Sequence, residues 1–370
     1  MTNCCQRNIP ENDEDTAAGC CSKGNKENAA QNTECCCSSE FLQGKDIAEI
    51  YQTDSAISFK NRLDHITARL GINRMGHIVK PGLYRLGEPG PDSEVFATAN
   101  YTLSFDALRK SLSGFNAWIL VLETYGVNVW CAAGKGTFGT EELINRIKIT
   151  NLSETVNHKK IILPRLAAPG VNAIEVLRKS GFHVIWGTIR SSDIPEFLKT
   201  GVITAKMKNV NFPVKDRMVL TPIEFLHYLP YFIIPAAVFG ILGFWAISGK
   251  LILTLIAGTI LFPALLYILP AKDFTIKGLC LGYIVMFPII LFEAIHTPAY
   301  GLWYYLQVVS DLLLWPAITG FLALNFTGST TFTSRSGVKK EIKRYTRPLF
   351  AMFISGILLA VLAGMTGVII

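Results

Sequence analysis

The sequence predicts an α/β domain followed by an all-α membrane domain of five helices. Up to about Leu220, short apolar runs alternate with helix-like stretches, whereas long apolar spans dominate from residue 221 onward. A polar, cysteine-rich start sets the first 40 residues apart from both. We therefore expect a tail over 1–40, an α/β domain over 41–220 and a transmembrane domain over 221–370.

The tail is rich in Asn, Glu, Ser and Cys, and its one aliphatic β-branched residue is Ile9. A segment of this composition cannot bury enough apolar surface to order itself, so we expect it to be disordered. The chain start lacks the apolar core of a signal peptide, which predicts a cytosolic N-terminus with reduced thiols. Seven of the nine cysteines lie in this tail: Cys4, Cys5, Cys20, Cys21, Cys35, Cys36 and Cys37. They are better suited to face a metal than to form a disulfide framework.

The charge of the chain is unevenly distributed. Residues 1–40 carry three basic and seven acidic groups, whereas residues 41–370 carry 32 basic and 21 acidic groups. Part of the basic excess is a cluster next to the membrane spans. We therefore expect no nucleic-acid partner.

The α/β prediction depends on the regular alternation of strand-like and helix-like segments along the chain. The strand-like runs are Val95–Ala99, Ala117–Leu122, Lys160–Leu163 and Phe182–Trp186. The helix-like stretches are Asp64–Leu70, Phe105–Leu112, Glu141–Lys148, Val171–Lys179 and Ile194–Lys199. This alternation predicts a Rossmann-like sheet with helices on its faces, in which ligands bind at the carboxyl ends of the strands.

The segment Asn128–Gly136, which reads Asn-Val-Trp-Cys-Ala-Ala-Gly-Lys-Gly, follows one of these strands. Its cysteine, Cys131, is either a small buried hydrophobe or a soft ligand for a metal. The small residues after it would let the backbone approach a large planar ligand, because glycine has no Cβ. Trp130 would then be a wall of the ligand site rather than a core residue.

Two other kinds of site are excluded at Cys131. No Cys-x-x-Cys or histidine cluster lies nearby, which argues against zinc or an iron–sulfur cluster. A phosphate loop would need glycine where Val129 stands and Ser or Thr where Gly136 stands.

Together with the following Thr137-Phe-Gly-Thr-Glu-Glu, this segment resembles the cap region of the HgcA family, the mercury-methylating corrinoid proteins related to the corrinoid iron–sulfur protein. The stretches that begin Phe96-Ala-Thr-Ala-Asn-Tyr, Ile161-Ile-Leu-Pro-Arg and Ser180-Gly-Phe-His-Val resemble strand–loop units of the same family. The five apolar spans match it too, so the resemblance runs from about residue 55 to the end.

The resemblance implies a corrinoid-dependent methyltransferase that passes a methyl group from cobalt to Hg(II), with Cys131 as catalytic residue and lower axial cobalt ligand. The cofactor is then a cobalamin-type corrinoid. The residues expected to bind it are Thr98, Asn128, Val129, Trp130, Cys131, Ala132, Ala133, Gly134, Lys135, Gly136 and Thr137. Lys135 would either be solvated or contact the phosphate of the corrinoid tail.

The implied partners are the ferredoxin-like electron donor HgcB and a methyl-folate or methyl donor protein. Two other functions stay open. One is a corrinoid methyl carrier of one-carbon metabolism, and the other is a non-enzymatic membrane protein that binds cobalamin or thiophilic metals. The tail cysteines would either capture Hg(II) by ligand exchange or have no essential role.

Each of the five apolar spans has about the 20 residues needed to cross a bilayer. They are Ile223–Ile247, Leu251–Leu269, Lys277–Ile295, Leu302–Phe326 and Leu349–Ile370. Basic residues cluster before the first span and in the second and fourth loops, and Lys250 is the basic residue assigned to the alternate loops. The positive-inside rule then predicts a cytosolic N-terminal domain, a C-terminus outside and a location in the cytoplasmic (inner) membrane.

Asp311 lies near the middle of the fourth span, where a charge is a functional candidate by default. Gln307, one turn away, is positioned to hydrogen-bond it. The alternative is that Asp311 ties helices together. Glu293 and His296 are expected at the membrane interface, and Cys280 in the third span is either a packing residue or part of a mercury relay.

Overall fold

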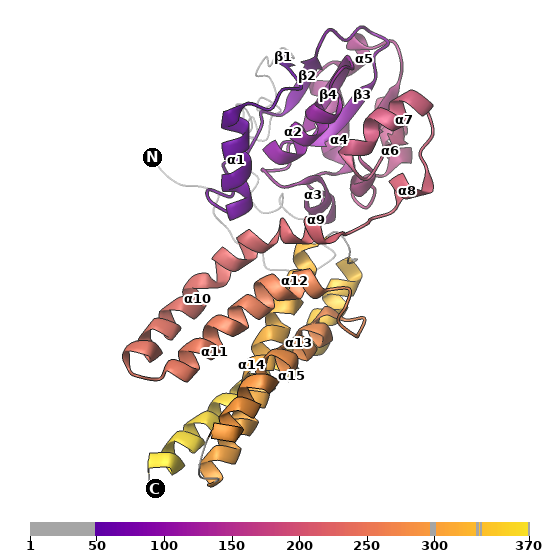
Figure 1. Cartoon of the computed structure of the whole chain (residues 1–370). Coiled ribbons are helices and arrows are strands. Elements are labelled where there is room, and N and C mark those ends of the chain that lie inside the picture. The colour runs from indigo at the N-terminus through magenta and orange to yellow at the C-terminus, as the bar shows by residue number, and fades with distance from the viewer. Residues whose placement is uncertain (1–48, 297–300, 331–332, 334, 369–370) are drawn as a thin grey trace, which may run out of the picture. The chain divides into compact units, whose positions relative to one another are not determined.

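The computed structural model describes residues 49–296, 301–330, 333 and 335–368. The predicted tail over 1–40, with its seven cysteines, lies outside the described residues. The rest forms an α/β part and a helical part (Figure 1). Each is considered by itself below.

The α/β part is built on a six-stranded sheet in the order β1-β2-β4-β3-β5-β6. The strands are β1 (Ile50–Thr53), β2 (Gly82–Leu86), β3 (Val95–Ala99), β4 (Ala117–Leu122), β5 (Lys160–Leu163) and β6 (His183–Trp186). The four predicted strands are confirmed, and β1 and β2 were not predicted. Strands β4, β3, β5 and β6 run parallel, but β2 pairs antiparallel with β4. The sheet is therefore mixed, and the Rossmann-like label stays a prediction.

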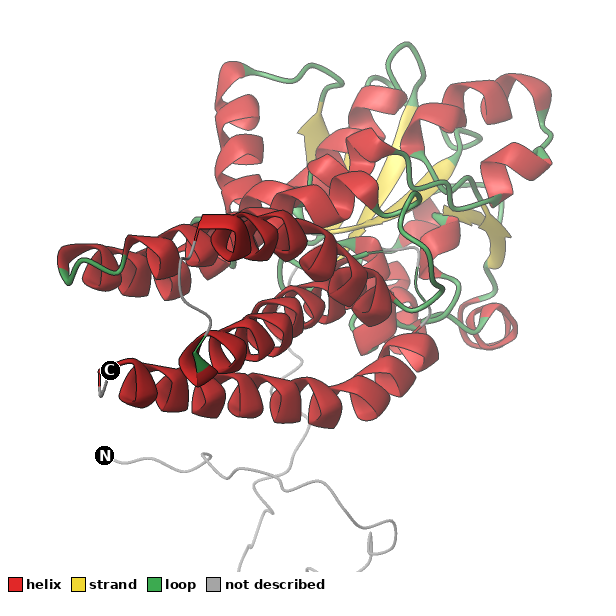
Figure 2. Ribbon diagram, turned by 60° about the horizontal axis from the view of Figure 1, so that its bottom comes forward, coloured by secondary structure: helices red, strands yellow, loops and turns green. Residues whose placement is uncertain are grey.

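Helices cover both faces of the sheet, as Figure 2 shows. They are α1 (Phe59–Leu70), α2 (Thr102–Ser111), α3 (Val129–Lys135), α4 (Thr140–Ile149), α5 (Leu152–Thr155), α6 (Ala173–Ser180) and α7 (Ile194–Thr200), with short 3-10 turns at Arg165–Ala167 and Ser191–Asp193. Along β4, Leu120 joins the cluster under α4 whereas Ile119 joins the cluster under α2. Alternation puts successive side chains on opposite faces, so a strand covered on both faces is apolar throughout.

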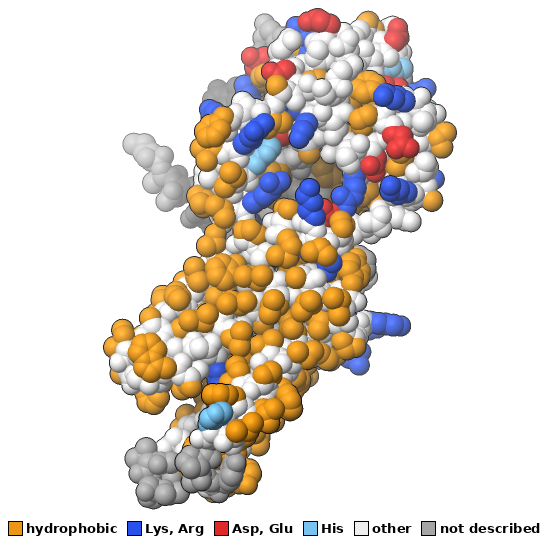
Figure 3. Space-filling view, viewed as in Figure 1, with side chains coloured by type: hydrophobic (Ala, Val, Ile, Leu, Met, Phe, Trp, Pro, Cys, Tyr) orange, Lys and Arg blue, Asp and Glu red, His pale blue; other side chains and the backbone are white. Residues whose placement is uncertain are grey.

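The chain then passes through α8 (Ala205–Lys208) and α9 (Val214–Met218) into long apolar helices. These are α10 (Thr221–Ile241), α11 (Trp245–Ile256) continued by a π-helical turn at Ala257–Leu261 and by α12 (Phe262–Leu265), α13 (Phe274–His296), α14 (Leu302–Phe326) continued by a 3-10 turn at Thr327–Ser329, and α15 (Arg335–Val368). Within the described residues, five helical segments are long and apolar enough to cross a membrane, which confirms the predicted number. The side chains on their surface are largely apolar (Figure 3).

Small residues let the central helix α14 approach its neighbours. A Cβ at Gly278 would lie 2.4 Å from the Cβ of Ala323, and one at Gly356 would lie 2.9 Å from the Cβ of Leu314. Both α13 and α15 therefore pack against α14 at nearly backbone distance. Membrane helices commonly associate in this way, because lipid provides little hydrophobic drive for helix pairing.

Three boundaries predicted from sequence are wrong. The first span ends at Ile241, and the chain turns through Gly243, which has a φ of +86°, so that α11 already begins at Trp245. Lys250 is therefore a helical residue and not a loop residue. The last helix begins at Arg335 rather than near Leu349, because the basic segment before the apolar span continues the same helix. Orientation and the inner membrane stay predictions.

Candidate functional site

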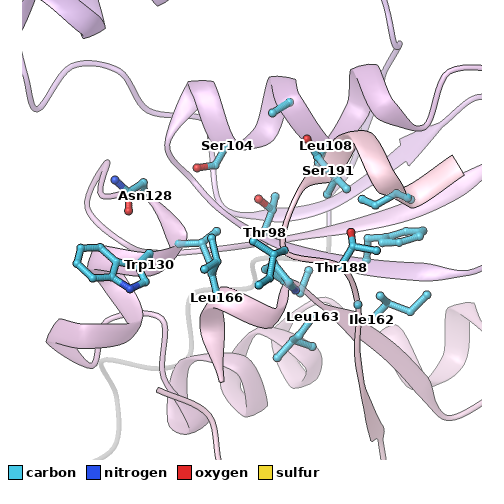
Figure 4. A pocket seen from close by; sticks show the side chains of 18 of the residues that line it. Thr98, Ser104, Leu108, Asn128, Trp130, Ile162, Leu163, Leu166, Thr188 and Ser191 are labelled. Carbon is cyan, nitrogen blue, oxygen red and sulfur yellow. The ribbon is translucent and has the colours of Figure 1, made fainter. Parts of the chain in front are cut away.

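The candidate site lies where the parallel strands end. A cavity of about 240 Å³ opens there, lined by residues of β3 and β5, of α2 and α3, and of the loops after β5 and β6. In Figure 4, Asn128 and Trp130 lie at one end of the cavity and Thr188 and Ile162 toward the other. The carboxyl ends of parallel strands are the usual ligand position in such sheets, so the cavity lies where the sequence predicted a ligand site, and ligand binding there stays a prediction.

Asn100 organises the loop that leads to the cysteine segment. Its side chain is 1% exposed, and its Oδ1 accepts hydrogen bonds from the backbone N–H of Thr124 and of Gly126, both at 3.1 Å. Its Nδ2 donates to Glu123 Oε1 at 2.7 Å. One buried amide thereby fixes residues 123–126 next to the end of β4. Sequence reasoning missed Asn100, although its place directly after a fully buried strand was a usable signal.

Asn128 begins the helix that carries the cysteine. Its side-chain Oδ1 accepts a hydrogen bond from the backbone N–H of Cys131 at 2.9 Å, which is the usual N-cap arrangement. Gly136 ends the helix with a φ of +84°. The short helix α3 is thus defined at both ends by residues of the motif, and Cys131 stands in its first turn.

The predicted cofactor residues separate into four groups. Thr98, Asn128, Val129 and Trp130 line the cavity, whereas Cys131 is half-buried beside it and is not part of the lining. Ala132 and Ala133 are buried in the core under the sheet. The last group, from Gly134 to Thr137, forms the end of α3 and the residues after it.

The small residues of the motif pack closely against other parts of the α/β part. A Cβ at Gly170 would lie 2.9 Å from the Cα of Ala133, so the loop after β5 packs directly on α3. Ala132 is fully buried, and Thr137 Oγ1 donates to its carbonyl at 3.4 Å. The backbone of the motif is therefore closely packed. Ala132 and Ala133 pack against the sheet and the loop of Gly170. Lys135 is exposed and carries one of the charges near the thiol.

Burial raises the pKa of the Cys131 thiol above its ordinary value, and the Asn128 contact and the charges of Lys135 and Arg74 oppose this only in part. The free thiol is therefore protonated at neutral pH. Arg74 comes from the loop after α1, which sequence reasoning did not connect to the site. No local sequence pattern marks Arg74, because its proximity to Cys131 arises from the fold.

His77 holds that loop in place. Its Nδ1 lies 2.7 Å from Asp64 Oδ1, and its Nε2 lies 2.7 Å from the carbonyl oxygen of Ile72. Both partners are acceptors, so both ring nitrogens must carry a hydrogen and the ring is an imidazolium. Burial opposes this charge, but the hydrogen bonds to Ile72 and Asp64 outweigh it and raise the pKa of His77 above its ordinary value.

Residues 69–198 match the family model of the CO dehydrogenase/acetyl-CoA synthase delta subunit. Among curated proteins, the chain is similar to the gamma subunit of the acetyl-CoA decarbonylase/synthase complex. That of Archaeoglobus fulgidus is 35% identical over 123 residues, which are 33% of this chain and 26% of the relative. That of Methanocaldococcus jannaschii is 34% identical over 128 residues, which are 34% of this chain and 26% of the relative.

The chain therefore spans about a quarter of the length of these relatives. The matched residues include the whole cavity region and stop before the apolar helices. These similarities support the wider relationship predicted from the sequence, to the family of the corrinoid iron–sulfur protein large subunit. The assignment to its mercury-methylating relatives stays a prediction.

Proposed function

We propose that this chain is a membrane-bound corrinoid methyltransferase that transfers a methyl group to Hg(II) and forms methylmercury. One observation carries the proposal. A single half-buried thiol stands in the first turn of α3, beside an apolar cavity at the carboxyl ends of parallel strands. The similarity of residues 69–198 to subunits of acetyl-CoA decarbonylase/synthase complexes supports a methyl-transfer role for that part.

The donor set fits a corrinoid. Within residues 49–296, 301–330, 333 and 335–368, no three His, Cys, Asp or Glu side chains converge to hold a metal ion. A corrin ring brings four nitrogen ligands of its own, so the protein would need to add only one further ligand. A lone thiol next to Trp130 and an apolar cavity meets that requirement. A corrinoid bound there would supply a methyl group on cobalt.

Cys131 determines the direction of electron flow in this proposal. A thiolate donates more electron density to a metal than an imidazole does, which favours departure of a methyl group together with its bonding electron pair. Hg(II) is a soft electrophile and accepts a group in that form. Burial raises the pKa of the free Cys131 thiol, so a metal that bound the sulfur would have to displace its proton.

The surrounding residues position that sulfur. Asn128 fixes the backbone N–H of Cys131, and Asn100 fixes the loop before it. Thr98 and Trp130 form part of the cavity wall. In the proposed cycle, HgcB supplies electrons and a methyl-folate or methyl donor protein supplies the methyl group, on the cytosolic side of the inner membrane.

A second candidate is a corrinoid methyl carrier of one-carbon metabolism. The names of the relatives favour it, because they are subunits of a complex that makes or cleaves acetyl-CoA. A carrier would pass its methyl group to an acceptor other than Hg(II), and it would not depend on a thiolate at residue 131.

The test uses the full-length chain purified from a host supplied with cobalamin. We expect bound cobalt, a visible spectrum with a cobalt–sulfur signature, and methylmercury formation when Hg(II), a methyl donor and a reductant are added. Cys131→Ala should lose both the signature and the activity, whereas Cys280→Ala, a control thiol in α13, should keep the signature.

Three outcomes contradict the proposal in different ways. A colourless, cobalt-free protein would show that the chain binds no corrinoid. A Cys131→Ala variant that methylates mercury at the parent rate would show that Cys131 is not the required cobalt ligand. Bound corrinoid without any methyl turnover to Hg(II) would favour the carrier or a non-enzymatic binding protein.

A further inference from the structure

A second concave surface lies between α1 and α2 and has a volume of about 510 Å³. Three basic side chains line it, Arg62 and Arg69 from α1 and Lys110 from α2. His65 lies between the two arginines, and the spacing of three, four and seven residues puts all three on one face of α1. Figure 3 shows Lys and Arg side chains gathered with a histidine on the surface of the α/β part. We call this surface the basic cleft.

Among the described residues, the three cations of the basic cleft form no ion pair. In the described part of the chain, Arg62, Arg69 and Lys110 have no carboxylate within ion-pair distance. The one carboxylate in the lining, Asp106, is 3% exposed and already accepts from Arg109 Nε and His65 Nε2, both at 2.7 Å. Within the part of the chain that the structure describes, the cleft therefore has three cations without an ion-pair partner and one carboxylate whose two oxygens both accept hydrogen bonds.

This arrangement favours an anion. Like charges that converge in a cleft repel one another and raise the local potential, and an anion relieves both effects. Two guanidinium groups and an ammonium group approach from two different helices. A phosphate presents acceptor oxygens in several directions and can meet donors from both helices, whereas a carboxylate presents two oxygens in one plane.

We propose that the basic cleft binds a phosphate group carried by a small molecule. Ala107 of α2 lines both the basic cleft and the cavity beside Cys131, so the two sites are neighbours on either side of one helix. Two sources supply the same chemistry. One is the phosphate in the nucleotide loop of a bound corrinoid, which rests on the proposed function, and the other is a separate phosphorylated molecule.

The test compares the full-length double variant Arg62→Gln/Arg69→Gln with the parent. Lys60→Gln serves as the matched control, because Lys60 lies on the same helix and does not line the cleft. The first measurement is inorganic pyrophosphate binding at constant ionic strength. The second is the ratio of the affinities for cobalamin and for cobinamide, which has the same macrocycle without the nucleotide loop.

Loss of two charge-assisted contacts should weaken phosphate binding about tenfold or more. If the phosphate belongs to a separate molecule, the double variant loses pyrophosphate affinity and keeps the cobalamin to cobinamide ratio. If it belongs to the corrinoid, the ratio falls in the double variant and stays at the parent value in Lys60→Gln.

The proposal is overturned if the double variant matches Lys60→Gln in both measurements. Failure of the proposed function looks different. In that case neither cobalamin nor cobinamide binds the parent, while the pyrophosphate measurement still decides whether the cleft takes phosphate.

Discussion

Asp106 in the α/β part and Asp311 in the membrane helices are both buried carboxylates, with 3% and 1% of their surfaces exposed. Asp106 is neutralised by Arg109, three residues later on α2, and His65 Nε2 of α1 lies 2.7 Å from its Oδ2. Asp311 on α14 bonds Lys250 of α11 at 2.7 Å, and Lys250 also bonds Glu293 of α13 at 2.9 Å. The ion pair of Asp106 with Arg109 lies within one helix, whereas the ion pairs of Lys250 join three helices.

Trp315 Nε1 donates to Asp311 Oδ1 at 2.7 Å and Gln307 Nε2 donates to it at 3.3 Å, which confirms the contact predicted for Gln307. The prediction that Glu293 is merely interfacial omitted its ion pair with Lys250. Both carboxylates obey the same rule, because a buried charge must be paired. The cation of Asp106 comes from its own helix, whereas that of Asp311 comes from another of the apolar helices.

The largest effect should come from Lys250→Met. This change leaves Asp311 charged and buried without its cation, which typically costs about 3–5 kcal/mol. Thermal unfolding of the detergent-purified chain should show a strongly lowered midpoint. The double variant Lys250→Met/Asp311→Asn should recover part of the loss, and an unchanged midpoint in Lys250→Met would contradict the role given to this pair.

Asp106→Asn should cost less, about 1–3 kcal/mol. Arg109 would still donate from its Nη1 to the carbonyl oxygens of Asp54 at 2.7 Å and of Ala56 at 2.6 Å, so its charge keeps local partners. The same unfolding measurement applies. A loss as large as that of Lys250→Met would mean that the remaining partners of Arg109 do not compensate for its lost carboxylate.

The His77–Asp64 pair should give the α/β part a pH dependence. The pKa of His77 is raised above its ordinary value of 6.5, so its stabilisation is complete below 6.5 and is lost as pH rises through the raised value. Burial raises the pKa of Asp64, but the Thr102 and His77 hydrogen bonds lower it below 3.8, so its stabilisation is lost as pH falls through the lowered value.

We therefore expect the loop of residues 71–79 to be best protected between these two limits. Amide exchange in this loop, corrected for intrinsic rates, should increase in the parent as the pH rises through the raised pKa of His77. His77→Gln should remove this rise. A parent loop whose corrected protection does not change through that range would show that His77 is not the group that titrates.

The smallest effect should come from Lys179→Gln. Lys179 bonds Glu141 at 2.8 Å and Glu175 at 2.9 Å on the surface, where water screens the charges and ordering long side chains offsets the gain. We expect no measurable change in the unfolding midpoint. A clear loss would show that surface pairs contribute more here than the buried pairs suggest.

Several elements were readable from local sequence. The runs Val95–Ala99, Ala117–Leu122 and Lys160–Leu163 coincide with β3, β4 and β5, because strands covered on both faces are continuously apolar. β1 and β2 were missed, since Ile50–Thr53 is short and partly exposed and β2 contains Arg85 within a turn-rich stretch. The boundary near Ile241 was misplaced because apolar residues continue through the turn.

The amino-acid sequence alone determined the α/β strands β3 to β6, the five apolar helices and the place of the Cys131 segment after β4, because these follow from runs of local hydrophobicity and length. Only the tertiary structure decided that Lys250 neutralises Asp311, that Arg74 lies near the thiol, and that Ala132 and Ala133 face the core. The physical reason is that charge pairing and close packing depend on which distant segments meet. Local sequence patterns indicate which residues are buried, but not which distant residues they contact.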